Sequence, residues 1–215
     1  MHYDAIENRH GLAHDPLKAL LVPRPIGWIS TISKAGLVNL APYSFFNGVA
    51  EKPGYVVFGS AGRKDNLRNI EETDEFTCSL ATYDLRDQMN TTSAPVPRGE
   101  DEFPLAGLTA APSRYVKPPR VKESPVALEC RHFQTIALPG AGRYQQNYHL
   151  VIGLIVGIYI DDRFIKDGIV DTAGMMPIAR LGYMDYSVVR PDTIFTIERP
   201  TADEARAKAQ TDKPT

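Results

Sequence analysis

The feature that most constrains the fold is an apolar run from Tyr148 to Ile160, which is rich in β-branched residues and contains Gly153 and Gly157. It is too short to cross a membrane, since a spanning helix needs about 20 predominantly apolar residues. A strand that is apolar on both faces must be covered on both sides. The two glycines suit a bend or bulge at a barrel corner. The run therefore predicts a long strand in a barrel wall or against a second subunit.

Further strand signals flank this run and are separated by tight turns. Residues 26–33 and 37–41 surround a turn that closes on Gly36, which predicts a β-hairpin. The alternation in residues 126–133 predicts a strand with one buried face. Trp28 is expected in the core. Other strands are expected over residues 55–60, 76–82, 178–181, 186–189 and 194–197.

Helical signals are fewer. Asp65 and Asp84 are good N-cap residues, and each is followed by apolar residues at helical spacing. A short helix followed by a turn at Pro16 is expected near the N-terminus. Residues 93–125 are interrupted repeatedly by proline and glycine. Long loops in compact domains are usually functional or disordered, and we interpret this one as an ordered flap or a subunit-contacting segment.

The order of these elements favours one fold class. There is no strand–helix alternation and no GxGxxG motif, which disfavours a Rossmann domain. A mainly β fold fits best, namely a closed antiparallel barrel with a few surface helices. We expect one domain over residues 20–200, preceded by an N-terminal extension over residues 1–19. A flexible polar tail is expected over residues 201–215.

Composition argues against several classes of partner and site. The formal net charge of -2 does not favour nucleic acid as a partner. Cys78 and Cys130 lie in apolar runs and are interpreted as buried thiols. The five histidines show no metal-ligand spacing. The first residues lack the apolar segment of a signal peptide, so we expect a soluble cytoplasmic protein that binds no metal and no membrane.

Residues 60–66 form the most informative local segment. The chain leaves a strand at Ser60, turns on small residues, presents Arg63 and Lys64, and enters a helix at Asp65 and Asn66. Backbone amides at a helix N-terminus, together with two cations, suit a phosphate monoester. The alternative interpretation is a solvated loop with ordinary surface cations.

A second segment places aromatic and amide side chains at a turn directly after a strand: Tyr43, Ser44, Phe45, Phe46 and Asn47. A planar heterocycle needs apolar faces and hydrogen-bonding groups at its polar edge. The segment is therefore a candidate wall for such a ring. The alternative interpretation is a core aromatic cluster with a capping asparagine.

Taken in order along the chain, these and other segments resemble the flavin reductase-like family. Each segment is weak alone, and the number and order of the matches carry the resemblance over roughly residues 20–200. The matching segments are residues 23–26 (PRPI), the strand through Ser30 and Thr31, and residues 39–47 (NLAPYSFFN), 64–70 (KDNLRNI), 101–103 (DEF), 106–108 (AGL), 112–113 (PS), 118–120 (PPR), 123–125 (ESP), 128–130 (LEC), 150–153 (LVIG), 177–182 (PIARLG) and 185–186 (DY).

The resemblance implies a split β-barrel, a homodimer and FMN bound near the subunit interface. In relatives, the segment matching residues 43–47 lines the isoalloxazine and ribityl chain, and the loop matching residues 60–66 holds the phosphate. The strand around Ser30 and Thr31 lies near the flavin, and the segment around Arg180 can approach it as well.

The chain departs from the family pattern at three positions. Asn66 stands where relatives often have Thr or Ser, and Leu154 stands where many have Glu. His149 falls one position later than a histidine of some nicotinamide-using members, and one residue reverses the face on a strand. We interpret His149 as a hydrogen-bonded wall residue rather than a nicotinamide contact.

The leading functional hypothesis is an NAD(P)H:flavin oxidoreductase that passes hydride from NADH or NADPH to FMN and supplies a partner oxygenase. The cofactor carries the redox chemistry, so no catalytic side chain is named. One alternative is a non-catalytic FMN-binding protein or electron carrier. The other is a ligand-binding barrel without flavin.

Overall fold

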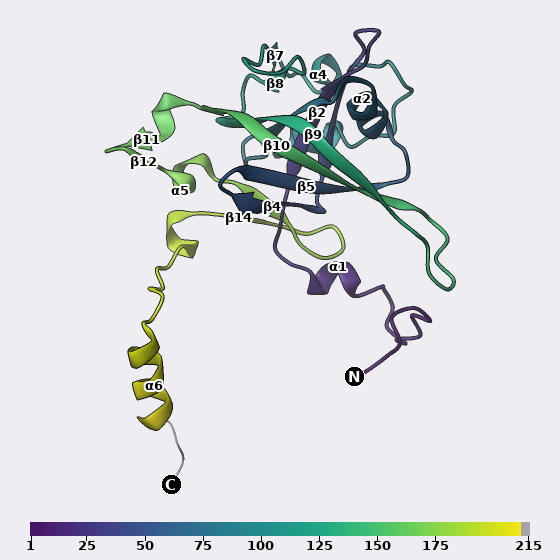
Figure 1. Ribbon diagram of the computed structural model, residues 1–215. Helices are drawn as coiled ribbons and strands as arrows, with labels where there is room; N and C mark the ends of the chain where they lie inside the picture. Colours follow the sequence, from purple (N-terminus) through teal and green to yellow (C-terminus); the bar gives the residue numbers. More distant parts are fainter. Residues whose placement is uncertain (212–215) are drawn as a thin grey trace.

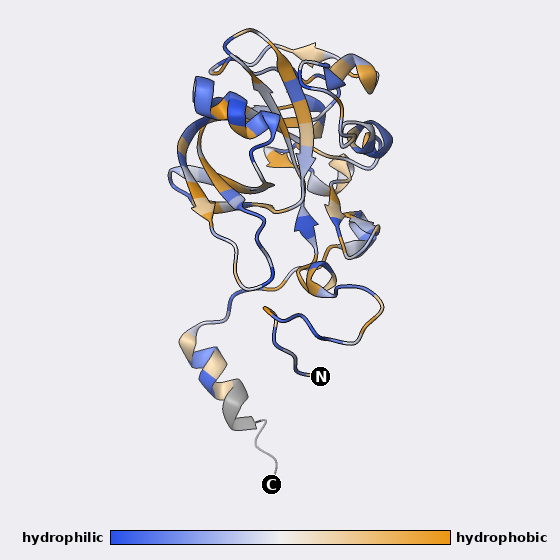
Figure 2. Cartoon of the chain, turned by 90° about the vertical axis from the view of Figure 1, so that its right-hand side faces the viewer, coloured by the Kyte–Doolittle hydropathy of each residue, from blue (hydrophilic) through white to orange (hydrophobic). Residues whose placement is uncertain are grey.

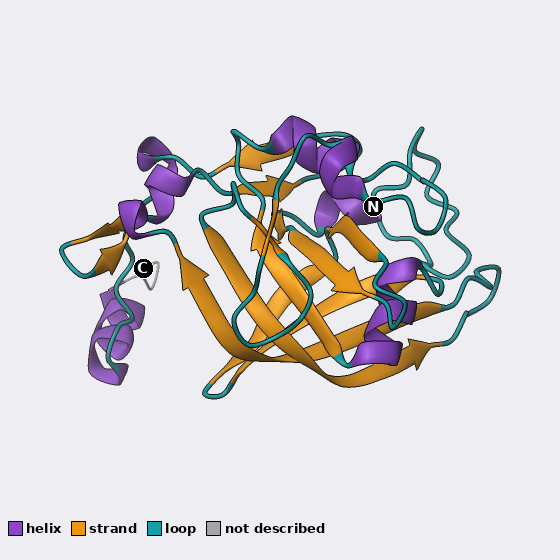
Figure 3. Cartoon of the chain, turned by 90° about the horizontal axis from the view of Figure 1, so that it is seen from above, coloured by secondary structure: helices purple, strands orange, loops and turns teal. Residues whose placement is uncertain are grey.

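The computed structural model of the chain describes residues 1–211 and is built around a seven-stranded antiparallel sheet (Figure 1). The strand order is β3-β2-β6-β9-β10-β5-β4. Figure 3 shows these strands curling around a common centre, with helices at the periphery. The strands are β2 (Gly27–Ile32), β3 (Val38–Tyr43), β4 (Phe46–Glu51), β5 (Gly54–Ala61), β6 (Glu75–Leu80), β9 (Val126–Leu138) and β10 (Tyr148–Ile160).

The barrel is split between its two edge strands. β3 and β4 are consecutive in the chain and are joined only by Ser44 and Phe45. They form the two ends of the sheet and do not pair with each other among the described strands. This confirms the predicted mainly β, antiparallel split-barrel fold, and it places residues 43–47 at the split.

Smaller elements surround the barrel. β1 (Arg24–Pro25), β13 (Ile178–Arg180) and β14 (Tyr186–Val188) form a three-stranded sheet. Two hairpins pair β7 (Ala110–Ala111) with β8 (Arg120–Val121) and β11 (Ile165–Lys166) with β12 (Ile169–Val170). The α-helices are α1 (Leu17–Leu20), α2 (Asp65–Thr73), α3 (Arg86–Thr91), α4 (Glu102–Leu105), α5 (Thr172–Met175) and α6 (Ala202–Thr211), and two short 3-10 turns lie at Asp162–Phe164 and Pro191–Thr193.

Strand β2 contributes to two hydrophobic cores because both of its faces are buried. Ile29 packs into a cluster with Phe58 and with Leu67 of α2, whereas Trp28 packs into a second cluster with Phe103. Trp28 is buried, as predicted, and its Nε1 donates to Thr92 Oγ1 at 2.9 Å. Each large apolar side chain that is fully buried stabilises the fold by about 1.5–3 kcal/mol. Figure 2 shows hydrophobic residues concentrated in the strands.

The proline-rich segment 93–125 is ordered and packs on the outer face of the sheet. Small polar side chains on the strands bind its backbone, because carbonyls and amides that leave water need partners. Thr77 Oγ1 donates to Pro118 O at 2.9 Å, and the Ser79 hydroxyl accepts from the Val121 amide at 3.1 Å. The segment thereby covers a face of the sheet that would otherwise be exposed.

That cover corrects the expectation of one buried face for residues 126–133. Ala127 and Cys130 lie on opposite faces of β9 and are both buried. Glu129 is also buried, and its carboxylate accepts from the backbone amide of Arg114 at 2.9 Å. Alternation indicates two chemically different faces, but it does not show what covers the polar one.

Three further expectations need correction. The N-cap residues of α2 and α3 are Lys64 and Leu85, not Asp65 and Asp84. Residues 1–16 contain a turn but no helix, and α1 follows Pro16. The predicted strand over residues 194–197 is absent, because no neighbouring strand of the described chain pairs with it. The flexible tail over residues 201–215 stays a prediction: it contains α6, and its residues 212–215 lie outside the described residues.

Candidate functional site

The turn at the barrel split exposes the Phe45 side chain, buries Tyr43 and half-buries Phe46. Tyr43 and Phe46 pack inward: the Tyr43 ring lies 4.7 Å from the Phe58 ring, and a Cβ added to Gly27 would lie 2.4 Å from the Phe46 ring. Phe45 is 39% exposed. Of the predicted aromatic wall, Phe45 is therefore the part that a planar ligand can reach without rearrangement.

Burial also fixes the chemistry of Tyr43. It raises the pKa of the Tyr43 phenol to about 12, although contacts with Asn66 and Ser60 partly oppose the shift. Tyr43 therefore stays a neutral hydroxyl. Ser44 is half-buried, and Asn47 is exposed with its Oδ1 accepting from the Gly48 amide at 2.9 Å.

Strand β5 brings the two candidate segments together. The Gly59 amide donates to Phe45 O at 2.8 Å, which holds the turn against β5. A Cβ added to Gly59 would lie 3.2 Å from the Phe45 Cβ, so glycine permits this close approach. The next residue, Ser60, begins the candidate anion loop. The structure thus joins the aromatic turn and the basic loop in one region.

The loop after β5 leads to an uncapped helix N-terminus. Gly62 has φ +77, which favours glycine, and its amide donates to Asn147 O at 3.0 Å. The N-cap residue of α2, Lys64, makes no side-chain capping hydrogen bond. The first turn of a helix leaves backbone amides without helical acceptors. These amides and the helix dipole form an anion-binding arrangement.

The two predicted cations of this loop differ in their partners. Arg63 binds Glu71, with Nη1 3.0 Å from Oε1, so its charge is compensated. Asp65 accepts from Arg98 at 2.7 Å. Lys64 is exposed, and no carboxylate of the described residues lies within ion-pair distance of it. Lys64 is therefore the free cation beside the helix N-terminus.

Three predicted site residues instead fasten α2 and the outer segment to the sheet. Asn66 is buried, and its Oδ1 accepts from Thr31 Oγ1 at 2.7 Å while its Nδ2 donates to Ile29 O at 3.2 Å. Ser30 is buried on the opposite face of β2, where its hydroxyl donates to Pro119 O. These internal hydrogen bonds occupy polar atoms of Ser30, Thr31 and Asn66, and the contact of these three residues with a ligand stays a prediction. Ser60 is also buried and donates to Gly62 O at 2.9 Å, which shapes the loop from within.

Two arginines meet beside the aromatic turn. Arg24 pairs with Arg180 across the β1–β13 ladder, and its guanidinium lies 5.6 Å from the centroid of the Phe45 ring. Arg24 is 7% exposed and donates to Leu181 O at 2.8 Å, but its buried Nε has no partner among the described residues. Burial first, and then the Arg180 charge, lower the Arg24 pKa.

Neither arginine has an acidic partner within ion-pair distance in the part of the chain that the structure describes. Arg180 donates to Tyr186 Oη at 2.5 Å and to Tyr183 O. The Arg24 guanidinium also donates to Lys18 O at 2.5 Å and to Leu21 O, but these carbonyls carry no full negative charge. Buried charges are normally paired, so the buried Arg24 beside the half-buried Arg180 favours an anionic group. Sequence reasoning named Arg24 only within a family motif. The available signal was a cation between two prolines at the start of an apolar strand.

His149 lies beside the same loop, directly opposite Ser60 in the β5–β10 pairing. Its Nδ1 is buried and has no hydrogen-bond partner among the described residues. The prediction that His149 is a hydrogen-bonded wall residue is therefore wrong for its Nδ1 atom.

Residues 1–211 contain no group of three or more His, Cys, Asp or Glu side chains arranged to hold a metal ion. None of their helices is long and apolar enough to cross a membrane.

Comparisons with known proteins agree with this architecture. Residues 19–178 match the family described as flavin reductase like domain. An uncharacterized protein from Halalkalibacterium halodurans is 34% identical over 192 residues, covering 86% of this chain and 90% of that protein.

Solved structures give the same result. Nitrilotriacetate monooxygenase component B from Bacillus cereus superimposes with a TM-score of 0.82 at 29% identity, covering 92% of this chain and 98% of that one. The 2-nitrobenzoate 2-nitroreductase of Pseudomonas fluorescens superimposes with a TM-score of 0.79 at 25% identity, covering 94% of this chain and 100% of that one.

Proposed function

The chain belongs to the flavin reductase-like family, and from this premise we propose that it binds FMN and oxidises NADH or NADPH. Bound FMN would supply the redox chemistry by accepting a hydride from the nicotinamide. The observation that carries the proposal is the junction of two features by one hydrogen bond: Phe45, which is exposed at the barrel split, and Gly59, which leads into the uncapped N-terminus of α2.

We assign the phosphate end of FMN to the α2 N-terminus. The first-turn amides of α2 donate toward it, and Lys64 adds a cation without a competing carboxylate. A phosphate monoester suits this site because it offers several acceptor oxygens and negative charge. Arg63 contributes less direct charge, since Glu71 already binds it.

The ring end of FMN is assigned to Phe45 and the arginine pair. Phe45 offers an apolar face, and Arg24 and Arg180 place positive charge beside it. Preorganised positive charge stabilises the negative charge that develops when a flavin is reduced. These side chains therefore bind, orient and stabilise charge, and none of them transfers a proton in this scheme.

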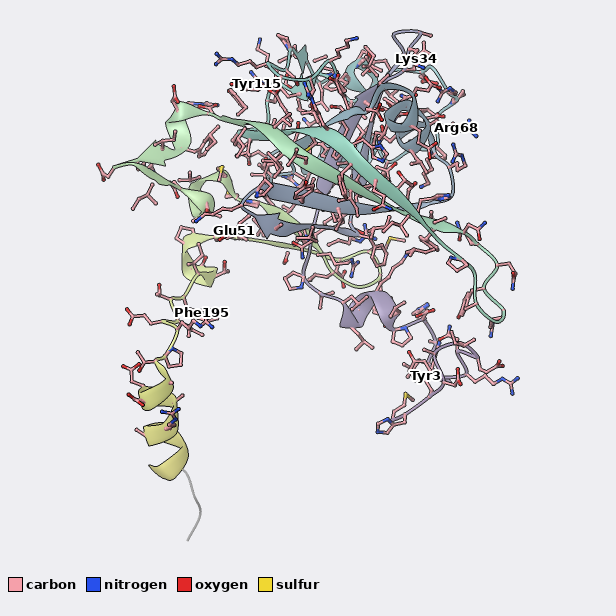
Figure 4. All side chains as sticks on the ribbon, viewed as in Figure 1. Tyr3, Lys34, Glu51, Arg68, Tyr115 and Phe195 are labelled. Carbon is pink, nitrogen blue, oxygen red and sulfur yellow. The ribbon has the colours of Figure 1, made fainter. Side chains whose placement is uncertain are left out.

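We further propose a homodimer in which the partner subunit covers the site. Support comes from exposed apolar residues on three strands of the sheet: Val49 of the edge strand β4 is 59% exposed, and Phe133 of β9 and Ile158 of β10, both interior strands, are each 62% exposed. Contiguous apolar exposure marks interaction surfaces. Figure 4 shows Phe195 on the extended segment that leads to α6, apart from the barrel. Such an arm can reach a second copy of the chain.

We also propose a recipient for the reduced flavin and a cellular location for the protein. The likeness to a monooxygenase component supports an oxygenase as the recipient of reduced flavin. A cytoplasmic location is supported by Cys78 and Cys130, which are both buried and unpaired.

Absorbance spectroscopy of the purified protein tests the function. We expect the protein to bind FMN, and NADH or NADPH to bleach the visible flavin bands under anaerobic conditions within seconds to minutes. Flavin that binds but stays oxidised with both nicotinamides would instead support an electron carrier. A protein that binds no FMN would contradict the proposal altogether.

A further inference from the structure

One cavity shares Arg180 with the proposed flavin site but is lined by no residue of the aromatic turn or the basic loop. Its volume is about 390 Å³, and it opens between residues 83–90, which include α3, and the β13–β14 hairpin. This volume lies within the range of about 300–1,000 Å³ that is typical of small-molecule sites. The residues that line the cavity include Tyr83, Arg86, Met89, Ile178, Arg180 and Tyr186.

Backbone hydrogen bonds hold the two walls of this cavity together. The Tyr83 amide donates to Met176 O at 2.9 Å, and the Ile178 amide donates to Ala81 O at 3.1 Å. β13 and β14 then pair along their whole length. The cavity is therefore formed by regular structure on both sides, which favours a preformed site over a transient gap.

The interior is apolar and aromatic. Met89 and Ile178 are buried and form its base. Tyr83 and Tyr186 are partly exposed at its walls, and each ring has a guanidinium over it: Arg180 lies 4.6 Å from the Tyr186 centroid, and Arg86 and Arg190 lie 4.3 Å and 5.5 Å from the Tyr83 centroid. A flat ring can pack between such side chains.

The charge of the cavity is positive. Arg180 donates to neutral groups and has no acidic partner within ion-pair distance among the described residues. Asp87, the one acidic residue among those that line the cavity, lies 3.5 Å from Arg86, but its side chain is 84% exposed. Exposed pairs of this kind contribute little. Arg86 also donates to Tyr83 O at 2.8 Å, which is a neutral acceptor. A ligand with one negative group would therefore meet two guanidinium groups that lack a buried acidic partner among the described residues.

We propose that this cavity binds a planar aromatic carboxylate, with the ring against Tyr83, Met89 and Ile178 and the carboxylate on Arg86 and Arg180. The guanidinium fork matches carboxylate geometry. Arg180 also pairs across the sheet with Arg24, so the ligand sits next to the proposed flavin slot. Binding itself does not require flavin, and the inference therefore goes beyond the proposed function.

Calorimetric titration of the full-length protein with benzoate tests the proposal. Benzamide is the matched neutral planar probe, and acetate is the matched anion without a ring. We expect benzoate to bind at least about tenfold more tightly than either, because a charge-assisted contact is worth that factor or more. Equal affinity for benzoate and benzamide, or no benzoate binding, would overturn the proposal.

Two variants locate the site. Arg86→Gln should weaken benzoate binding about tenfold or more, whereas Arg68→Gln, an exposed arginine on α2, should leave it unchanged. Ser187→Trp should block the cavity, whereas Ser93→Trp, outside it, should not. FMN affinity measured in the same proteins should match the parent in all four. If Arg86→Gln and Ser187→Trp both bind benzoate as tightly as the parent does, the assignment is wrong, whatever their affinity for FMN.

Discussion

Glu102 shows how one buried side chain links the outer segment to the barrel. It is buried, and its carboxylate accepts from the Leu40 amide in β3 at 2.8 Å. Burial raises the pKa of Glu102 above its ordinary value of 4.5, and the Leu40 contact opposes this only in part. The folded state therefore holds the Glu102 proton more tightly than the unfolded state does.

The sign of the resulting pH dependence follows by linkage. The stability that protonated Glu102 contributes is fully present below its pKa in the unfolded state. This contribution is lost as the pH rises through the raised pKa of the folded state. Glu102→Gln should thus be more stable than the parent at neutral pH, since an amide oxygen still accepts from Leu40. Urea unfolding at pH 5 and pH 8 measures this. Glu100→Gln, which changes an exposed glutamate nearby, should leave the free energy of unfolding unchanged. A Glu102→Gln variant that is less stable than the parent at pH 8 would contradict the account.

The candidate site could be predicted only in part at this scale. The sequence indicated Phe45 and Lys64, because an aromatic turn and a basic helix start are local patterns. It could not assign Ser30, Thr31 and Asn66 to internal hydrogen bonds, because their partners lie far away in the chain. Arg24 was missed as a site residue for the same reason: its neighbours Phe45 and Arg180 come from other elements.

At the scale of elements, helix α2 is fastened to the barrel by two buried amides, Asn66 and Asn69, and the Asn69 Nδ2 donates to Thr31 Oγ1 at 3.0 Å. Asn66 connects with Thr31 of β2 and with Asn39 of β3, whose Nδ2 donates to Asn66 Oδ1 at 2.9 Å. The position of the anion loop depends on this contact, because Asn66 lies in the first turn of α2. Asn66, a predicted ligand contact, therefore also positions the candidate anion loop.

Asn66→Ala should lower the free energy of unfolding by about 2–4 kcal/mol, since it leaves several buried groups without partners. Urea unfolding measures this, with Gln146→Ala as the control for an exposed amide. If the two variants had equal stability, the fastening role of Asn66 would be wrong.

Element types were predictable where the pattern was local and strong. The apolar run over β10 and the hairpin of β2 and β3 follow directly from periodicity and turn residues. Residues 194–197 have the composition of a strand but form none, because a strand requires a neighbour to pair with. The burial of both faces of β9 was likewise decided by the distant segment 93–125.

At the scale of the whole molecule, exposed apolar side chains on the sheet predict self-association. Phe133 packs edge-on against Tyr55 at 5.6 Å and still exposes most of its surface. Phe133→Glu should convert the proposed dimer to a monomer in sedimentation velocity experiments. Ile169→Glu, on the β11–β12 hairpin, provides the control, because Ile169 is 72% exposed and lies outside the barrel sheet. A parent protein that sediments as a monomer would contradict the dimer.

The central claim is that the turn at the barrel split and the N-terminus of α2 together hold a flavin phosphate and ring. Titration of the flavin-free protein with FMN, followed by flavin fluorescence, tests it most directly in Lys64→Ala and in Lys122→Ala, which removes an exposed lysine elsewhere. We expect Lys64→Ala to weaken FMN binding by about 1.5–3 kcal/mol and Lys122→Ala to leave it unchanged. Equal FMN affinity in both variants and the parent would contradict the claim.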